Sequence, residues 1–285
     1  MNIIQETKFL INKYNIKANK NYGQNFLVDE NALLEIVKVS EISKNDLIIE
    51  IGPGLGTLTS LLTRNSGKVI CIELDSNMIT VLEDRFSLYD NFELIHGDIL
   101  KIDLNEVIKN NLANSNLNSV KVVANLPYYI TTPIIMKLLE SKLNLKKITV
   151  MVQKEVGMRL TDSPGNSDTG AITYSINYYT NPTLVMVVPN TSFIPSPKVD
   201  SAIISLDVLK EPKVKPLDEL LFFKIIKSAF MQKRKTLLNS LSNANIKDKK
   251  YLEKMLNELN IDLKIRPERL TLEQFAQISD YIYKN

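Results

Sequence analysis

Short apolar runs alternate with helical patterns along the first three-quarters of the chain. The runs are rich in Val, Ile and Leu and are bounded by polar residues or glycine, which is typical of buried strands. They are Leu47–Ile51, Lys68–Ile72, Phe92–His96, Val120–Ala124 and Lys147–Val152. Apolar residues spaced three to four positions apart predict helices between them, at Thr57–Arg64, Met78–Leu88 and Ile134–Leu139. This alternation predicts an α/β fold, a mainly parallel sheet with helices on both faces.

The rest of the chain departs from this alternation. Two β-like runs, Leu184–Val188 and Ala202–Leu206, can extend the sheet as a hairpin or an edge. After the charged segment 211–216, with its two prolines, only helical patterns follow, at Leu217–Leu241, Lys247–Leu259 and Leu272–Lys284. We therefore predict two domains, a sheet-containing domain over 1–210 and a small all-helical C-terminal domain over 211–285.

Composition narrows the class of protein. The 285 residues are 44% hydrophobic and 24% charged, as in ordinary globular proteins. No apolar run reaches the length of about eighteen residues that a membrane span needs, and the N-terminus lacks the pattern of a secretory signal. The single cysteine, Cys71, excludes an intramolecular disulfide framework and a cysteine-rich zinc site. We expect a cytoplasmic protein without a metal and without membrane attachment.

Charge is distributed unevenly along the chain. Residues 207–285 contain 16 Lys and Arg against 11 Asp and Glu, whereas residues 1–206 contain 19 against 21. A basic bias of this size fits a nucleic-acid partner, although it is also common on solvated helices.

A glycine-rich loop, Glu50–Gly56, joins the first predicted strand to a helix. Gly52 and Gly54 allow the backbone to turn tightly and to approach a ligand closely. The spacing is Gly-x-Gly-x-Gly, not the Gly-x-Gly-x-x-Gly that seats a pyrophosphate, and Glu50 at its head would repel phosphate. The same acid can help to hold the ammonium end of S-adenosylmethionine. The alternative is a purely structural strand-to-helix turn.

Two further acids follow at the ends of the next strands. Glu73 lies about twenty residues after the loop, where doubly wound nucleotide-binding folds place the acid that accepts hydrogen bonds from ribose hydroxyls. Asp98 can accept a hydrogen bond from the adenine amino group of the cofactor, or it can simply cap the following turn.

The segment Asn125–Tyr128, Asn-Leu-Pro-Tyr, follows the fourth strand, at the edge where parallel sheets bind ligands. An adenine N6 amine is a poor nucleophile because its lone pair is delocalised into the ring. The Asn125 side-chain oxygen and the Leu126 carbonyl can accept its two hydrogens and favour a tetrahedral nitrogen, and Pro127 fixes the direction of that carbonyl. Tyr128 offers a face on which an extruded base can stack. A strand-ending turn without catalytic function is the alternative.

Phe193 is a second aromatic candidate, in the proline-containing segment Ser192–Ser201. It can sandwich the base against Tyr128, although such a loop is more often a simple connector.

Taken together, the motifs resemble those of the small-subunit ribosomal RNA adenine N6-dimethyltransferases. They occur in order over nearly the whole chain: Tyr22–Leu27, Glu50–Thr59, Glu73–Asp75, Gly97–Asp98, Asn125–Tyr128, Phe193–Ser201, Gln232–Leu237 and Arg266–Leu270. The resemblance implies a Rossmann-like class I methyltransferase sheet and a small helical domain that contacts RNA. It also implies S-adenosylmethionine as methyl donor and dimethylation of two adjacent adenines near the 3′ end of 16S rRNA.

The resemblance also implies individual roles. Asn25 and Leu27 are expected to border the cofactor, together with Gly52, Glu73, Asp98 and Asn125. The cluster Lys233, Arg234 and Lys235, in a helical pattern, is expected to contact RNA, although it can also be a solvated helix face. Leu238 stands where relatives often carry a further basic residue. Tyr129 stands where some carry Asn, and we expect no change of chemistry from it.

The expected partner is the 16S rRNA of the immature small ribosomal subunit, bound by a monomer. Two alternatives remain. One is a large-subunit rRNA adenine dimethyltransferase of the macrolide-resistance type. The other is a ribosome-assembly factor for which methylation is secondary or absent.

Overall fold

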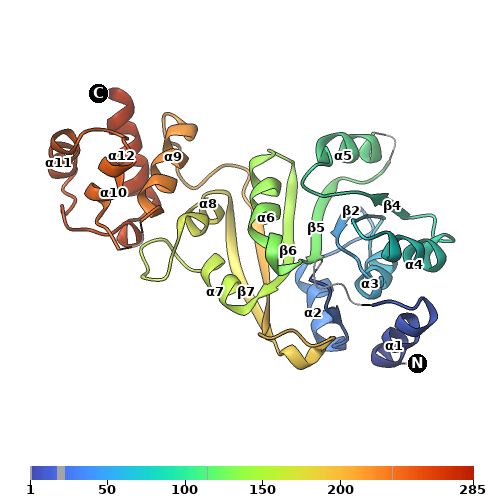
Figure 1. Ribbon diagram of the computed structural model, residues 1–285. Coiled ribbons are helices and arrows are strands. Elements are labelled where there is room, and N and C mark those ends of the chain that lie inside the picture. The colour runs from blue at the N-terminus through green and yellow to red at the C-terminus, as the bar shows by residue number, and fades with distance from the viewer. Residues whose placement is uncertain (1, 18–22, 114, 233) are drawn as a thin grey trace. The chain divides into compact units, whose positions relative to one another are not determined.

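The computed structural model describes residues 2–17, 23–113, 115–232 and 234–285. The chain forms two compact units (Figure 1). The first contains Met1–Met158 and Thr183–Val208, and the second contains Arg159–Pro182 and Leu209–Asn285.

Helices and strands alternate in the first unit, as the apolar pattern predicts. They are α1 (Ile3–Lys13), β1 (Phe26–Leu27), α2 (Glu30–Val39), β2 (Asp46–Ile51), α3 (Thr57–Asn65), β3 (Lys68–Glu73), α4 (Ser76–Phe86), β4 (Phe92–His96), α5 (Leu104–Leu112), β5 (Ser119–Asn125), η2 (Tyr128–Ile130), α6 (Thr131–Glu140), β6 (Leu145–Gln153), η3 (Asn190–Ser192), β8 (Phe193–Ile194) and β9 (Ser201–Val208). Two elements, α7 (Lys154–Leu160) and β7 (Thr180–Val188), run across the boundaries between the units.

Within the described ranges, seven strands form one sheet in the order β4-β3-β2-β5-β6-β9-β7. Strands β4, β3, β2, β5 and β6 are parallel, and β9 pairs with β6 in the antiparallel direction. The five predicted strands, the edge formed by the two later β-like runs and the α/β fold class are therefore confirmed.

The central strands β2, β3 and β5 are buried on both faces. Leu33 of α2 and Leu62 of α3 belong to one core cluster with Ile48, Val69 and Val123 of the sheet. Because side chains alternate along a strand, the neighbours of these strand residues point to the opposite face. They include Ile49, Ile70 and Val122, which have no exposed surface, so that face is covered too.

A buried ion pair joins β2 to β5. The Lys121 ammonium lies 2.8 Å from the Asp46 carboxylate, and their side chains are only 2% and 4% exposed. Asp46 also accepts hydrogen bonds from the backbone N–H and the hydroxyl of Ser43, and Lys121 also donates to the Glu41 carbonyl. Both charges are therefore compensated inside the protein, as burial requires.

Several elements were not predicted from the sequence, among them α1, α2, α5 and a small second sheet. That sheet is antiparallel and pairs β1 with β8, with Phe26 opposite Ile194 and Leu27 opposite Phe193. It joins the N-terminal segment to the segment that begins at Phe193, and the paired residues are 168 and 166 positions apart in the sequence.

The second unit is helical. Its elements are α8 (Ala171–Tyr179), α9 (Glu219–Phe230), α10 (Leu237–Asn243), α11 (Lys249–Glu258), η4 (Pro267–Arg269) and α12 (Leu272–Lys284). Tyr174 and Tyr178 of α8 share its buried core with Phe222 of α9 and Phe275 of α12. Because α8 packs here, this unit includes Arg159–Pro182, whereas the division predicted at residue 210 assigns that segment to the sheet.

The prediction of a single helix over Leu217–Leu241 was wrong, because the structure has two helices in this range. Helix α9 ends at Phe230, and α10 begins after Thr236, whose hydroxyl accepts the Asn239 N–H. The N–H of Leu237 donates to the Ile265 carbonyl at 2.8 Å, which fixes the start of α10. Among the described helices, none is both long enough and apolar enough to cross a membrane.

Candidate active site

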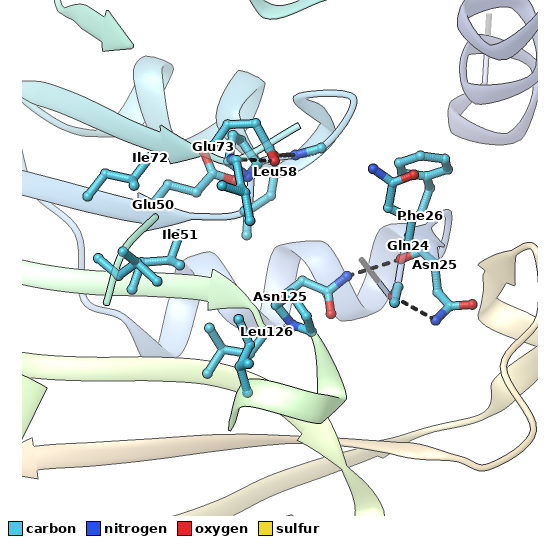
Figure 2. Close-up of a pocket in the computed structure, with 18 of the residues that line it drawn as sticks. Gln24, Asn25, Phe26, Glu50, Ile51, Leu58, Ile72, Glu73, Asn125 and Leu126 are labelled. Atoms are coloured by element: carbon cyan, nitrogen blue, oxygen red, sulfur yellow. Dashed lines mark hydrogen bonds between the residues drawn. The ribbon is translucent and has the colours of Figure 1, made fainter. Parts of the chain in front are cut away.

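A pocket opens at the carboxyl ends of β2, β3, β4 and β5 (Figure 2). It collects most of the residues that the sequence suggested, from five separate segments of the chain. Those that line it are Asn25, Leu27, Gly52, Gly54, Glu73, Asp98, Asn125, Leu126, Pro127 and Tyr128. The predicted cofactor and acceptor residues are thus brought to one place.

The glycine loop after β2 forms one wall. Gly52 and Gly54 have φ values of 66° and 56°, in the left-handed region that favours glycine. A Cβ at Gly54 would lie 3.3 Å from the Phe26 ring, so the loop passes close under β1. The Gly54 N–H donates to Glu73 Oε2 at 3.2 Å. The backbone can therefore lie flush against a ligand, while the loop is held by the acid that follows β3.

Glu73 is fixed by backbone donors. Its Oε1 accepts the N–H groups of Leu74 and Asp75 at 2.8 and 2.9 Å, and only 8% of the residue is exposed. Burial raises the pKa of the Glu73 carboxyl above its ordinary value. Figure 2 shows Glu73 beside the glycine loop, so its carboxylate is presented to the pocket in one orientation.

Glu50, expected to help hold an ammonium group, lies in the floor of the pocket. It is 2% exposed, and its Oε2 accepts the Thr59 hydroxyl at 2.6 Å and the Cys71 thiol at 3.3 Å. Burial raises the pKa of Glu50 to about 7. One of its oxygens is therefore already occupied by internal donors.

Asp98 combines the two uses considered from the sequence. It lines the pocket, and its Oδ1 accepts the Leu100 N–H at 2.9 Å, as an aspartate at a turn does. This hydrogen bond fixes the carboxylate at the end of β4.

The side chain of Asn125 points from the end of β5 toward the N-terminal segment (Figure 2). Its Nδ2 donates to the Asn25 carbonyl at 3.3 Å, and this orients Oδ1 as the remaining acceptor of the amide. The N–H of Leu126 donates to the Met151 carbonyl at 3.1 Å, and Pro127 has φ −58°. Two consecutive acceptors are thus held on a constrained backbone.

The two predicted aromatic residues differ in position. Tyr128 is half-buried in the pocket wall, with its hydroxyl 2.7 Å from Ser201 Oγ, and burial raises its pKa. Phe193 does not line the pocket: it is only 2% exposed and belongs to the core cluster that contains Leu27. The Phe193 ring is therefore packed in the core and not presented to the pocket, and its expected role against the base stays a prediction.

Other lining residues were missed as site residues, among them Gln24, Phe26 and Tyr129. Gln24 donates to Asp75 Oδ2 at 2.7 Å, Phe26 lies over Gly54, and Tyr129 lies at η2, 55% exposed. The run Gly23–Leu27 did supply a signal, since it was part of the resemblance. Tyr22, in the same motif, lies outside the described residues.

The described lining carries charge of one sign. It includes Glu50, Glu73 and Asp98, and no Lys, Arg or His among the residues that the structure describes there. A pocket of this kind favours a cationic ligand and repels phosphate.

Two residues of the predicted RNA-binding cluster, Arg234 and Lys235, lie in the second unit, not on a helix but in the turn between α9 and α10. Arg234 and Lys235 are exposed there, and the Lys235 N–H closes the turn on the Gln232 carbonyl at 3.0 Å. Lys233 lies outside the described residues. Leu238, the second residue of α10, is 6% exposed and packs in the core of the unit.

Comparison with known proteins agrees with this geometry. The family model described as ribosomal RNA adenine dimethylase matches residues 15–284. The ribosomal RNA small subunit methyltransferase A of Clostridium botulinum (strain Langeland) is 48% identical over 277 residues, which are 97% of this chain and 98% of that protein.

Two solved structures are similar to the chain. A dimethyladenosine transferase from Plasmodium falciparum has a TM-score of 0.74 at 28% identity, covering 91% of this chain and 98% of the other. The 23S rRNA methyltransferase ErmE has a TM-score of 0.69 at 22% identity, covering 91% and 100%, and shows the fold alone. Since the family model spans the pocket and both compact units, and since the identity to a full-length relative is high, the chain belongs to the ribosomal RNA adenine dimethylase family.

Proposed function

We propose that this enzyme dimethylates the N6 amines of two adjacent adenines near the 3′ end of 16S rRNA, with S-adenosylmethionine as methyl donor, during maturation of the small subunit. One observation carries the proposal: a single pocket joins the glycine loop, Glu73 and Asp98 to Asn125–Tyr128. A donor site and an acceptor site that share one pocket are what direct methyl transfer requires.

The pocket residues fit S-adenosylmethionine. This cofactor supplies an electrophilic methyl group when bound, and it is cationic at sulfur and nitrogen and contains no phosphate. The acidic lining suits that charge, whereas a dinucleotide would bring its phosphates against Glu50 and Glu73. We assign Glu73 to the ribose hydroxyls and Asp98 to the adenine amine, with Asn25, Leu27, Gly52 and Gly54 shaping the walls. The proposed reaction requires no metal.

Asn125 and Leu126 prepare the acceptor. In the first transfer, Asn125 Oδ1 and the Leu126 carbonyl accept the two N6 hydrogens, which directs the nitrogen lone pair out of the ring plane; in the second transfer, one N6 hydrogen remains for these acceptors. Pro127 and the hydrogen bond from Leu126 to Met151 keep these acceptors in place. Because the nitrogen becomes acidic as it is alkylated, its proton can leave without a strong general base, and positioning provides most of the acceleration.

Tyr128 supports the flipped base in this proposal, because its ring lines the pocket next to the acceptors. The hydrogen bond between the Tyr128 hydroxyl and Ser201 Oγ, at 2.7 Å, holds the ring in this orientation. Phe193 can join it only if the ring leaves its buried position, so its contribution stays a prediction.

The small-subunit substrate is favoured by sequence similarity. The named small-subunit relative is 48% identical, whereas the 23S enzyme shares only the fold at 22%. We further propose that the second unit contacts the RNA through Lys233, Arg234 and Lys235, and that a monomer acts on the immature small subunit in the cytoplasm.

The test compares substrates directly. The protein is incubated with tritiated S-adenosylmethionine and, separately, with purified unmodified small subunits and purified large subunits. We expect label in 16S rRNA, recovered as dimethyladenosine. Label in large-subunit RNA alone would favour the macrolide-resistance type, and binding of small subunits without label would favour an assembly factor.

A further inference from the structure

Arg85, in the last turn of α4, connects the glycine loop to the N-terminal helix α1. Its Nη1 donates to the Leu55 carbonyl of the loop, and its Nη2 donates to Glu6 Oε1 of α1. Nη2 also donates to Ser60 Oγ of α3 at 3.4 Å. Only 14% of the Arg85 side chain is exposed. The guanidinium is therefore largely withdrawn from water, and its direction is fixed by a carboxylate on one side and by the loop on the other.

Leu55 directly follows Gly54 in the glycine loop and lines the pocket. Its side chain is 1% exposed and packs in one core cluster with Leu10 of α1. On the other side of the loop, the Gly54 N–H donates to Glu73 Oε2 at 3.2 Å. Two neighbouring residues of the loop are thus held from opposite directions, one by an acid of the pocket and the other by Arg85.

Helix α1 reaches the loop only indirectly, because none of its described residues lines the pocket. Leu10 lies in the core cluster that contains residues of α4, and Lys13 forms a salt bridge with Asp84 at 2.7 Å. Glu6 neutralises the charge of Arg85 in this contact between the helices. A change in α1 can therefore reach the pocket through the guanidinium, without contact between α1 and a ligand.

We propose that Arg85 is a positioning residue for the methyl donor, which holds the glycine loop through the Leu55 carbonyl, and that Glu6 of α1 holds Arg85 in turn. A loop that contains glycines has more backbone freedom to lose when a ligand binds. A loop that is already fixed avoids this entropic cost, so the ligand binds more tightly. This inference rests on the proposed function, because it takes S-adenosylmethionine as the ligand of the pocket.

Three substitutions isolate this connection. Arg85→Met removes both donors and keeps an unbranched apolar side chain in place of the arginine stem. Glu6→Gln removes only the charge that faces Arg85. Lys13→Met is the matched control: it also removes one positive charge between α1 and α4, but its salt bridge with Asp84 involves no atom of the glycine loop. Calorimetry gives the Kd for S-adenosylmethionine, at a temperature at which circular dichroism shows every variant to be folded.

We expect the Kd for S-adenosylmethionine to rise about tenfold in Arg85→Met and about threefold in Glu6→Gln, within the range found for substitutions that act on a ligand without touching it. Lys13→Met should stay within about twofold of the wild type, as the loss of an exposed pair does. Because Glu6 acts through the guanidinium, Glu6→Gln should cause no further rise when it is added to Arg85→Met. At saturating cofactor, kcat and the KM for small subunits should change less than about twofold, since only binding of the donor is affected.

A merely structural role for Arg85 makes a different prediction: the melting temperature of Arg85→Met falls and its Kd stays that of the wild type. That result would overturn the inference, as would a rise in Kd that is equal in Lys13→Met or additive in the double variant. The proposed function would stand in each case, because the wild-type protein would still bind the donor and label 16S rRNA. If the wild type binds no S-adenosylmethionine, both the proposed function and this inference fail.

Discussion

At the scale of single residues, the polar side chains of the pocket are oriented by hydrogen bonds to other parts of the protein. Asn125 donates to Asn25 and thereby turns its oxygen outward, and Glu73 accepts backbone N–H groups that hold its carboxylate. Catalysis of this type depends on orientation more than on the strength of any acid or base.

Asn125→Ala should therefore reduce kcat for methylation of small subunits by about a hundredfold, the usual effect of removing one preorganised polar group. The Kd for S-adenosylmethionine should change much less, because the other pocket walls remain. Radiolabel incorporation and calorimetry measure the two quantities. Asn105→Ala, on the exposed side of α5, is the control, and an unchanged kcat in Asn125→Ala would refute the proposed role in accepting the amine hydrogens.

Glu50 gives a prediction about stability and pH. Burial raises its pKa to about 7 from an ordinary 4.5, so between these values the folded chain keeps a proton that the unfolded chain has released. The stabilisation from this group is complete below pH 4.5 and is lost as the pH rises through 7. Glu50→Gln carries no charge, so its free energy of unfolding should exceed that of the wild type by about 3 kcal/mol above pH 7.

That difference should vanish near pH 4.5 when urea unfolding of the cofactor-free protein is followed across the range. The exposed substitution Glu106→Gln serves as the control. A difference between Glu50→Gln and wild type that is constant with pH would contradict the assignment of the shifted group.

At the scale of the elements, β2 and β5 carry the two halves of the pocket and are joined below it by Lys121 and Asp46. Asp46→Asn leaves a buried ammonium without its carboxylate and should lower the free energy of unfolding by about 3–5 kcal/mol. Glu35→Gln breaks the exposed pair with Lys38 and should lower it by less than about 1 kcal/mol. Urea unfolding at neutral pH measures both, and equal losses would show that burial of the first pair is unimportant.

The helices and strands also show which parts of the fold could be predicted from the sequence. The parallel strands were predictable because each is an apolar run with polar ends, and the pocket followed because parallel strands end at one edge. Strands β1 and β8 are two residues long, too short for any period, and their pairing is set by contacts distant in the chain. The end of α9 was missed because 217–241 contains neither Gly nor Pro, and the break depends on Thr236 and on Ile265.

Exposure is the other property that the sequence did not reveal. Phe193 and Tyr129 are both aromatic residues beside a motif, and nothing in the pattern distinguishes them. Phe193 packs in the core cluster that contains Leu27 and is 2% exposed, whereas 55% of Tyr129 is exposed.

At the scale of the whole molecule, charge is divided between the parts of the chain. The pocket in the first unit is lined by acids, whereas residues 207–285 have 16 basic residues against 11 acidic ones. We expect the donor and the RNA to be attracted by different parts of the protein.

The double substitution Arg234→Ala/Lys235→Ala should weaken binding of small-subunit RNA and reduce the slope of log K against log salt by about one for each lost phosphate contact. Cofactor affinity should not change. Lys249→Ala/Lys250→Ala removes the same charge from the exposed start of α11 and serves as the control. Equal slopes for the two double variants would show that only the net charge matters, not the turn between α9 and α10.

The acidic lining of the pocket also bears on competition among the adenosine-containing metabolites of a cell. In the proposed binding mode, ATP, AMP and NAD would offer the same adenine and ribose to Asp98 and Glu73 as the methyl donor, but each carries phosphate where the donor carries positive charge. If this binding mode is correct, we expect like-charge repulsion from the acids to disfavour these nucleotides without a steric barrier. We therefore expect a nucleoside analogue with a fixed positive charge to inhibit the enzyme better than a phosphorylated nucleoside.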